Sequence, residues 1–355
     1  MKAGWTINTL GNTCDMYQPK TISCKEMVQD GTYPVFGANG IIGRYDQYNH
    51  EEPQLLITCR GATCGSINIS EPFSWITGNA MVIRPKQEGI DIRFLEYILR
   101  GGINISEAIT GAAQPQITRT NLSPLKISYP TSLIEQQRIV AILDEAFEAI
   151  AVARANAEQN RQNARALFES YLQSVFSQRG DGWSEAKLSE CFRLKSGDAL
   201  TSKEMKSGEY PVYGGNGIAG THDTFNLSGN NVIIGRVGAL CGNARNIEES
   251  IWLTDNAFQV TDLKYDFDYA FLTYLLNFKN LRSLARQSAQ PVISNSSLKD
   301  LLLNFPNITE QRNIVIQLDA LSNKTQRLES LYQRKIAALD ELKQSLLQQA
   351  FNGQL

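Results

Sequence analysis

Two short stretches of the sequence carry the same small and polar residues at the same spacing. Gly37-Ala-Asn39-Gly40 and Gly214-Gly-Asn216-Gly217 each contain Asn-Gly, the strongest short signal for a tight β-turn. Small residues also let backbone amides and an asparagine side chain approach a phosphate group. We therefore predict hairpin turns here, with Asn39 and Asn216 as candidate DNA contacts. A turn that binds nothing is the simpler interpretation.

Arginine and glutamine residues follow both stretches in the same order. Arg60 and Arg236 each come after an apolar run, and we take them as equivalent. Arginine suits bidentate contacts with phosphate or guanine, although at a strand end it is as often a salt-bridged surface residue. Gln114 and Gln290 each precede a proline, and glutamine can pair with adenine or cap a turn. The neighbouring candidate contacts are Arg119, Arg282 and Arg286.

One spacing is typical of a metal-dependent nuclease. Asp198 is followed by Glu204-Met-Lys206, but the matching block in the first half of the chain has Val28 where Lys206 stands. A nuclease centre in one half of the chain and a solvated turn are both open. The chain has no GxxxxGK[ST] phosphate loop, no GxGxxG that opens a helix and no Pro-Pro methyltransferase motif. We expect no catalytic residue and no cofactor bound by this chain.

Cysteine and histidine are too scattered to predict a metal site. The six cysteines form no CxxC, and only His50 and His222 are present to complete a zinc set. We expect reduced thiols, as in a reducing cytosol. Without an apolar run of about 18 residues or a signal peptide, the sequence predicts a cytoplasmic protein.

The blocks recur because the chain contains two copies of one plan. Tyr33–Gly43 and Tyr210–Gly220 agree at eight of eleven positions, at an offset of 210 − 33 = 177 residues. Each copy begins with a part rich in Gly, Asn, Thr, aromatic residues and short apolar runs, which predicts mostly β-structure. The copies differ at Arg44-Tyr45, where the second has Thr221-His222. Arg44 is therefore a candidate for reading a sequence that only the first copy recognises, unless the difference is drift.

Each copy ends in a segment without internal glycine or proline, at about 134–179 and 309–351. Apolar residues three and four positions apart, including Leu167, Leu328 and Leu342, predict helices roughly 60 to 65 Å long. Shorter helices are predicted at Ile92–Arg100 and Phe267–Asn277. The predicted fold is α+β, with two mostly-β globular domains separated by two long antiparallel coiled-coil helices in a pseudo-two-fold repeat. Two helices that fold back on their own domains are the alternative.

Taken in order, the blocks resemble the specificity (S) subunits of type I restriction-modification systems. The resemblance rests on GxYPVxGxNGIxG, on the arginine before G-A-x-C-G, on W-x-T-x-N-A, on Gln-Pro, on EQQRI at the start of a long helix, and on the final LKQSLLQQAFNGQL. It spans essentially the whole chain. The blocks are short, so the resemblance depends on their combination and order.

The resemblance implies a non-catalytic subunit that reads double-stranded DNA. Residues 1–133 and 181–308 would be target recognition domains, each reading one half of a bipartite site, and 134–180 and 309–355 would be the family's conserved helices. The helices would fix the gap between the half-sites and receive two methyltransferase subunits, with Arg154, Arg161 and Arg165 on their outward faces. S-adenosylmethionine, ATP and Mg would belong to methyltransferase and restriction subunits. An S-like subunit of another restriction class and a scaffold that bridges two proteins are the alternatives.

The charge balance sets a limit on this prediction. The chain has 34 Lys and Arg against 36 Asp and Glu, and residues 1–133 alone carry eleven of each sign. Non-specific affinity for DNA scales with the number of phosphates neutralised. We therefore expect the chain alone to bind DNA weakly and in a salt-sensitive way.

Overall fold

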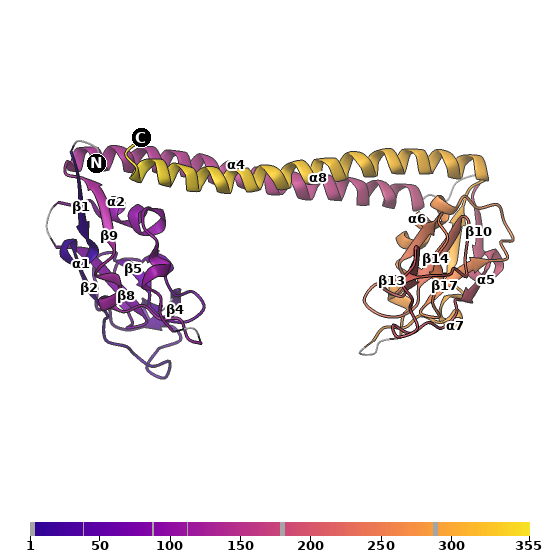
Figure 1. The fold of residues 1–355 in the computed structure, drawn as a ribbon, viewed down its shortest axis with the longest axis horizontal. Helices are drawn as coiled ribbons and strands as arrows, with labels where there is room; N and C mark the ends of the chain where they lie inside the picture. The colour runs from indigo at the N-terminus through magenta and orange to yellow at the C-terminus, as the bar shows by residue number, and fades with distance from the viewer. Residues whose placement is uncertain (1–3, 38, 87–88, 112, 178–181, 287–289) are drawn as a thin grey trace. The chain divides into compact units, whose positions relative to one another are not determined.

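The computed structural model describes residues 4–37, 39–86, 89–111, 113–177, 182–286 and 290–355. These residues form two units, Met1–Glu158 with Gln333–Leu355, and Gln159–Tyr332. Each unit contains one β-rich module and segments of two long helices, α4 (Leu133–Phe176) and α8 (Ile308–Phe351) (Figure 1). The predicted boundary at 180/181 lies outside the described residues. None of the described helices has the length and hydropathy needed to cross a membrane.

The module of unit 1 contains three small sheets. An antiparallel pair joins β1 (Trp5–Thr9) to β9 (Lys126–Pro130). The four-stranded sheet has the order β2 (Cys14–Tyr17), β8 (Ala80–Pro85), β5 (Leu55–Thr58), β6 (Ile67–Ile69). The three-stranded sheet has the order β4 (Gly40–Tyr45), β3 (Tyr33–Gly37), β7 (Trp75–Ile76). The helices of the module are α1 (Leu10–Thr13), α2 (Ile92–Tyr97), a π turn (Ile98–Gly102), a 3-10 turn (Ile105–Ala108) and α3 (Arg119–Leu122).

The module of unit 2 repeats this topology strand for strand. Its pair is β10 (Ser184–Lys187) with β18 (Leu302–Phe305), and its four-stranded sheet has the order β11 (Arg193–Ser196), β17 (Ala257–Thr261), β14 (Asn231–Gly235), β15 (Ala244–Ile247). Its three-stranded sheet has the order β13 (Gly217–His222), β12 (Tyr210–Gly214), β16 (Trp252–Leu253). The helices are α5 (Leu188–Cys191), α6 (Tyr269–Phe278), a 3-10 turn (Leu281–Leu284) and α7 (Asn295–Leu298). The matching sheet orders confirm the internal repeat and the α+β class.

The two predicted short helices are present with shifted ends. The first is shorter than predicted as an α-helix, because its last turn widens into the π turn. The second begins at Tyr269 rather than Phe267, because Asp268 caps it by accepting a hydrogen bond from the backbone N–H of Phe271. Asp91 caps α2 in the same way.

The ends of the long helices belong to the module cores. In unit 1 the buried cluster that contains Phe94 and Leu122 also contains Leu143 of α4 and Leu347 of α8. The unit 2 cluster likewise includes residues from the end of α4 and the start of α8, namely Val175, Phe176, Ile314 and Leu318. Burial of these apolar side chains fixes each helix end on its module.

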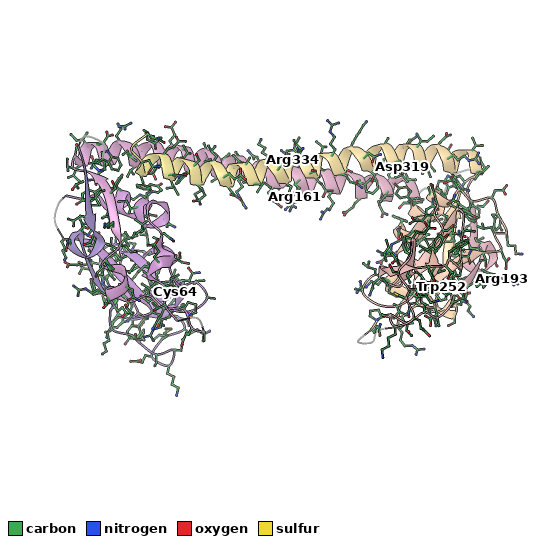
Figure 2. The ribbon with its side chains drawn as sticks, in the orientation of Figure 1. Cys64, Arg161, Arg193, Trp252, Asp319 and Arg334 are labelled. Atoms are coloured by element: carbon green, nitrogen blue, oxygen red, sulfur yellow. The ribbon has the colours of Figure 1, made fainter. Side chains whose placement is uncertain are left out.

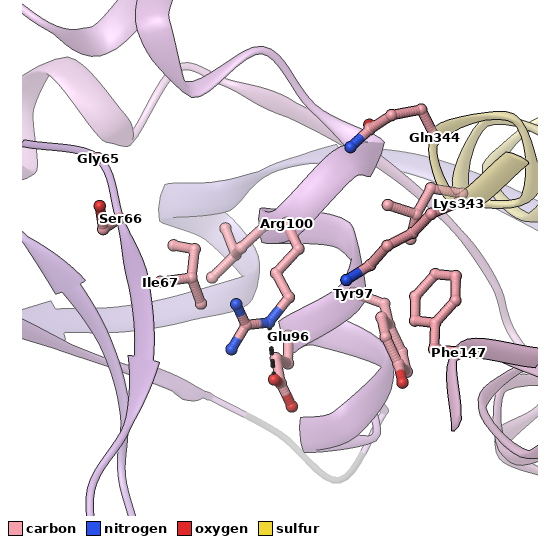
Figure 3. Close-up of a pocket in the computed structure, with 11 residues that line it drawn as sticks. Gly65, Ser66, Ile67, Glu96, Tyr97, Arg100, Phe147, Lys343 and Gln344 are labelled. Carbon is pink, nitrogen blue, oxygen red and sulfur yellow. Dashed lines mark hydrogen bonds and ion pairs between the residues drawn. The ribbon is translucent and has the colours of Figure 1, made fainter. Parts of the chain in front are cut away.

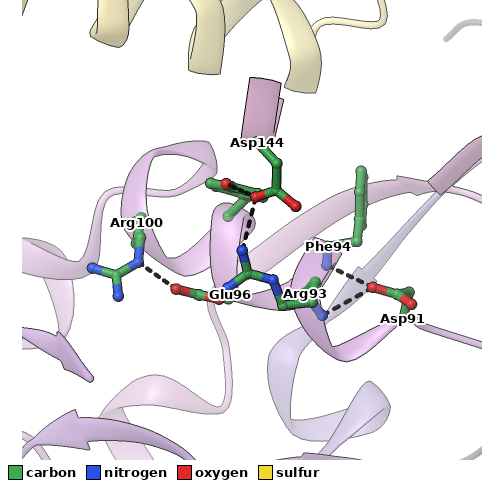
Figure 4. Close-up of polar contacts among 7 residues, drawn as sticks. Asp91, Arg93, Phe94, Glu96, Arg100 and Asp144 are labelled. Atoms are coloured by element: carbon green, nitrogen blue, oxygen red, sulfur yellow. Dashed lines mark hydrogen bonds and ion pairs between the residues drawn. The ribbon is translucent and has the colours of Figure 1, made fainter. Parts of the chain in front are cut away.

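Polar contacts add to this attachment in unit 1. Arg93 of α2 forms an ion pair with Asp144 of α4 at 2.8 Å, and the hydroxyl of Tyr97 donates to the same carboxylate. Figure 4 shows this arrangement together with the Asp91 cap and the ion pair of Arg100 with Glu96. In unit 2 the matching tyrosine, Tyr274, donates to Asp319.

Within each unit the α4 and α8 segments are antiparallel. Arg154 pairs with Asp340 in unit 1, whereas Arg165 pairs with Glu329 in unit 2. Two of the three arginines predicted on the outward faces therefore contact the neighbouring helix, although the side chains of Arg154 and Arg165 remain 53% and 65% exposed. These pairs are exposed, so their contribution to stability is small.

The buried stripe of the helices is narrower than predicted. Leu167 is 53% exposed, Leu342 46% and Leu328 38%, so these three residues are not in the buried stripe. On α4 the buried residues recur every seven positions at Leu143, Ile150, Ala157 and Ala164. One buried position in every seven makes a narrower contact than steps of three and four predict, so Leu167, three residues after Ala164, lies outside it. The sequence prediction was wrong at these positions.

Candidate nucleic-acid interface

The two Asn-Gly stretches form the predicted hairpin turns. Gly37 pairs with Gly40 between β3 and β4, and Gly214 pairs with Gly217 between β12 and β13. Gly40 and Gly217 have φ of 102° and 98°, a backbone conformation that glycine adopts without strain. Asn39 and Asn216 are exposed at the turns. Ala38 lies outside the described residues.

A loop that begins and ends with glycine, residues 61–65 in the first module and 238–242 in the second, lies beside the Gln-Pro segment. The backbone N–H of Gly61 donates to the carbonyl of Pro115 at 3.2 Å, and that of Gly238 donates to the carbonyl of Pro291 at 3.1 Å. Residues about 54 positions apart in the chain are thus held together by the same bond in each copy. Gln114 and Gln290 are exposed beside these loops.

In unit 2 the turn, the loop and the Gln-Pro segment meet, and we call these three segments the turn–loop cluster. A hollow of about 320 Å³ is lined by residues of all three, among them Asn216, Val237 and Gln290. A Cβ on Gly215 would lie 2.0 Å from the carbonyl oxygen of Val237, so only glycine lets the turn lie this close to the loop. Small residues and amide side chains leave room here for a ligand.

Two of the predicted contacts in unit 2 hold this loop in place. The side-chain oxygen of Asn216 accepts from the backbone N–H of Leu240 at 2.9 Å, and Arg282 donates to the carbonyl of Ala239. The loop of unit 1 is supported differently, because side chains of Ile105 and Ile109 lie beneath Gly65. Asn216 and Arg282 are therefore positioning residues of the cluster.

Arg60 and Arg236 are not equivalent, which corrects the sequence prediction. The backbone N–H of Cys59 donates to Asn79, and that of Arg236 donates to Asn256, so Arg236 corresponds to Cys59. Arg60 forms an antiparallel β-bridge with Gln116, and Val237 forms the matching bridge with Val292, so Arg60 corresponds to Val237. Both loops contain an arginine before the glycine, but the two arginines are one residue out of register in the strand.

The register shift gives the two arginines different surroundings. Arg236 is half-buried, with its guanidinium 5.3 Å from the ring centre of Phe258 and donating to the carbonyl of Asp255 at 3.3 Å. Arg60 is exposed, and its side chain makes no hydrogen bond or ion pair within the described part of the chain. Arg60 is therefore the more accessible of the two for a ligand.

Arg44-Tyr45 of the first module and Thr221-His222 of the second, where the two sequences differ, include side chains that make contacts within their own modules. Arg44 donates to the carbonyls of Gly31 at 2.6 Å and Thr32 at 2.7 Å, which ties the loop before β3 to β4. Tyr45 packs edge-on against Trp75 just as His222 packs against Trp252, the residue labelled in Figure 2. These side chains are engaged within their modules.

The remaining predicted contacts are exposed at the edges of the modules. Arg119 begins α3, and the backbone N–H of Arg286 donates to the carbonyl of Val292. Both side chains are accessible to solvent. The structure gives them no binding partner within the described residues, so they stay predictions.

The nuclease-like spacing does not form a site. The carboxylate of Asp198 accepts from Asn226 at 2.9 Å, whereas Lys206 pairs with Asp223 at 3.6 Å. Hydrogen bonds from Thr201 lower the pKa of Glu204. In the described ranges no three His, Cys, Asp or Glu residues are grouped so as to hold a metal ion. Asp198, Glu204 and Lys206 each contact a different residue, and they do not converge on one point.

Another hollow lies in unit 1, between the module and the long helices. It measures about 510 Å³ and is lined by Arg100, Tyr97, Phe147 and Lys343, among others (Figure 3). In unit 2 the place of Arg100 is taken by Asn277, whose amide bonds to the backbone of Ala244 at 2.9 and 3.1 Å. No motif in the sequence predicts this hollow, because its walls come from four segments that lie far apart in the chain.

Two further residues beside the turns were missed by sequence reasoning. Asn68 of β6 and Arg245 of β15 lie next to the Asn-Gly turns of their modules. They are also 245 − 68 = 177 residues apart, the offset of the repeat. A search for positions that match in offset but differ in residue type would have found them.

Comparison with known proteins follows the same internal repeat. A sequence model of the type I restriction modification DNA specificity domain matches twice, at residues 2–159 and 180–337. The type I restriction enzyme EcoprrI specificity subunit of Escherichia coli is 30% identical over 203 residues, which are 55% of this chain and 50% of that protein. The match thus spans about half the length of that relative.

Solved structures share the fold across the whole chain. One, described as the structural basis underlying complex assembly and conformational transition of the type I R-M system, has a TM-score of 0.79 at 17% identity and covers 100% of this chain and 99% of that one. The HsdS subunit from Thermoanaerobacter tengcongensis has a TM-score of 0.61 at 19% identity, covering 100% and 98%. At such identities the likeness concerns the fold alone.

Proposed function

This chain belongs to the type I restriction modification DNA specificity family, and from that membership we propose that it is the DNA-reading subunit of a type I restriction-modification complex. Each module would read one half of a bipartite site in double-stranded DNA. The observation that carries the proposal is the repetition of the family domain, with the same hydrogen bond between the loop and the Gln-Pro segment in both copies. Two similar reading heads suit two half-sites.

The helices would set the gap between the half-sites. α4 and α8 contain 44 residues each, and at 1.5 Å per residue such a helix measures about 66 Å. Each contributes one segment to either unit. In this proposal the helix pair would act as the spacer between the two modules.

Two methyltransferase subunits would dock on these helices. The described residues of α4 and α8 include apolar side chains that are largely exposed, among them Ile134 at 80%, Ile316 at 67% and Val152 at 57%. Docking would remove these apolar side chains from water, which would favour the association. Restriction subunits would join through the same complex.

The reaction would take place on the partner subunits. S-adenosylmethionine would bind the methyltransferase subunits, which would flip the target adenine, and ATP and Mg would serve the restriction subunits. This chain would bind none of these cofactors and would contribute no catalytic group. Its near-neutral charge also supports weak DNA binding by the isolated chain, with tight binding only in the complex.

Methylation mapping of the complex tests the proposal. The chain is co-expressed with its methyltransferase partner in a host without other adenine methylation, and the genome is mapped by long-read sequencing. We expect one asymmetric bipartite motif with a methylated adenine in each half. An assembled complex that transfers methyl groups without such a motif would overturn the proposal.

Two altered chains separate the roles of module and helix. Exchange of residues 1–133 for another family member's module should change one half-site and leave the other. Lengthening α4 by a few residues should change the gap but neither half-site. Changes in both half-sites after either alteration contradict the proposed division of labour.

A further inference from the structure

Asn68 and Arg245 occupy the same place in the two modules. Asn68 pairs with Leu56 between β6 and β5, and Arg245 pairs with Ile233 between β15 and β14. Both pairings keep the 177-residue offset of the repeat. β6 and β15 are the edge strands of their four-stranded sheets, and both side chains are partly exposed. The backbone frame is therefore shared, while the side-chain chemistry differs.

Both side chains are directed to the Asn-Gly turn. The side-chain nitrogen of Asn68 donates to the side-chain oxygen of Asn39 at 3.4 Å. In the second module a Cβ on Gly217 would lie 3.6 Å from Nη2 of Arg245. In each copy the edge strand thus adds one polar side chain to the turn that belongs to the candidate interface.

The guanidinium of Arg245 has unused hydrogen-bonding capacity. Its Nη1 atom is buried and, within the described part of the chain, has no hydrogen-bond acceptor. A buried donor without an acceptor destabilises a protein, so a movement of the guanidinium that brought Nη1 to an acceptor on a ligand would favour binding. Burial and then the charge of Glu249 raise the pKa of Tyr213, and the positive charge of Arg245 opposes this rise.

The two residue types recognise different bases. Arginine donates two hydrogen bonds to O6 and N7 of guanine, whereas asparagine pairs with N6 and N7 of adenine. A subunit that reads an asymmetric site needs such a difference on an otherwise shared frame. The turn itself does not provide it, because both copies carry Asn-Gly.

On these grounds, and resting on the DNA-reading function proposed above, we propose that Asn68 and Arg245 are specificity-determining residues. Arg245 selects guanine at one position of the half-site read by the second module. Asn68 selects adenine at the corresponding position for the first module. Asn39 orients Asn68 through their hydrogen bond, and the glycine at 217 leaves the guanidinium access to the turn.

Methylation mapping of the complex with variant chains tests this assignment. Arg245→Asn should lower the preference for guanine at one position of one half-site, roughly 5- to 150-fold, and leave the other half-site unchanged. Asn68→Arg should change one position of the opposite half-site. Arg245→Lys keeps the charge but loses the planar fork, so it should also reduce the preference.

Arg193→Asn is the matched control. Arg193 lies on β11, the opposite edge strand of the same sheet, where it is exposed and 3.8 Å from Asp262. It should leave both half-sites intact, and thermal unfolding of every variant establishes that it is folded.

Three results have distinct meanings. A wild-type complex without a bipartite motif defeats the proposed function itself. A wild-type bipartite motif that persists unchanged in folded Arg245→Asn and Asn68→Arg overturns the specificity assignment alone. An equal loss of methylation at every base, with no change of preference, also overturns it, because it indicates a phosphate contact or a structural role.

Discussion

In unit 1 the buried side chain of Gln136 makes three hydrogen bonds, and in unit 2 Gln311 makes the same three. Gln136 accepts from the backbone N–H of Asp91 and donates to the carbonyls of Gly89 and Pro130. Gln311 accepts from the N–H of Asp268 and donates to the carbonyls of Asp266 and Pro306. Both join the first turn of a long helix to the module.

Away from this junction the two modules differ. The loop beneath the turn is supported by Ile105 and Ile109 in the first copy and by Arg282 in the second. The edge strand carries Asn68 in one and Arg245 in the other. The comparison teaches that buried polar bonds maintain one frame, while the exposed chemistry near the turn is free to vary.

The largest expected effect comes from breaking the shared junction. Gln136→Leu leaves one backbone N–H and two carbonyls without their partner, so the free energy of unfolding of unit 1 should fall by about 3 kcal/mol. Gln311→Leu should have an effect of similar size in unit 2. Urea unfolding followed by circular dichroism measures both. Gln137→Leu, at an exposed neighbour, is the control and should change stability by less than about 0.5 kcal/mol.

An unequal result would modify the comparison. If Gln136→Leu cost no more than Gln137→Leu, the three bonds would not be what attaches the helix. If only one of the two buried glutamines mattered, the junctions would match in geometry but not in energy.

The shared backbone architecture of the two modules was predictable, because the sequence signals for it are local. The Asn-Gly turns, the repeat offset and the long helices follow from residue types and spacing within short windows. Which glutamine of Glu135-Gln136-Gln137 is buried was not predictable, because that depends on the rotation of α4 against a module formed by distant residues. The same holds for Leu167, whose spacing suits a buried stripe but whose side chain points outside it.

The candidate site was less predictable than the frame. Arg60 and Arg236 precede similar loops, yet one extra residue between arginine and glycine in the second copy moves Arg236 to the register position of Cys59. Successive residues of a strand point to opposite faces, so a shift of one residue changes the surroundings completely. Asn68 and Arg245 carry no motif and became visible only through the strand pairing.

The next effect concerns the support of the loop. Arg282→Ala removes the hydrogen bond to Ala239, so the loop of the second module should be less well positioned. We expect methylation of DNA that carries the half-site read by the second module to slow about fivefold. A fivefold change in rate corresponds to the loss of about one hydrogen bond. Ile105→Ala tests the apolar support of the first module. Equal effects of Arg282→Ala on both half-sites would show that the loops are not independent.

A smaller difference is expected at the two tyrosines that contact the long helices. Tyr274→Phe removes the 2.7 Å hydrogen bond to Asp319, which should reduce the stability of unit 2 by about 1 kcal/mol. Tyr97→Phe should cost less, because Asp144 keeps its ion pair with Arg93. Thermal unfolding of the two variants gives the comparison. A larger loss for Tyr97→Phe would mean that the hydroxyl, rather than Arg93, holds Asp144.

The smallest effect is a pH dependence that His50 gives to the first module. His50 is buried and contacts Tyr17 at 2.9 Å and Asn49 at 2.6 Å, whereas the second module has Leu227 at this position. Burial, and then the charge of Arg84, lower the pKa of His50. The unfolded chain, with a histidine pKa near 6.5, therefore binds a proton before the folded chain does as the pH falls.

It follows that the contribution of His50 to stability is present above about pH 6.5 and is lost as the pH falls through the pKa of the folded state. Between pH 7 and pH 5 the loss should be on the order of 1 kcal/mol or less. His50→Gln removes this titration, so the difference in urea midpoint between wild type and variant should shrink in that interval. A difference in urea midpoint that stays constant from pH 7 to pH 5 would show that the titration of His50 does not affect the stability of the first module.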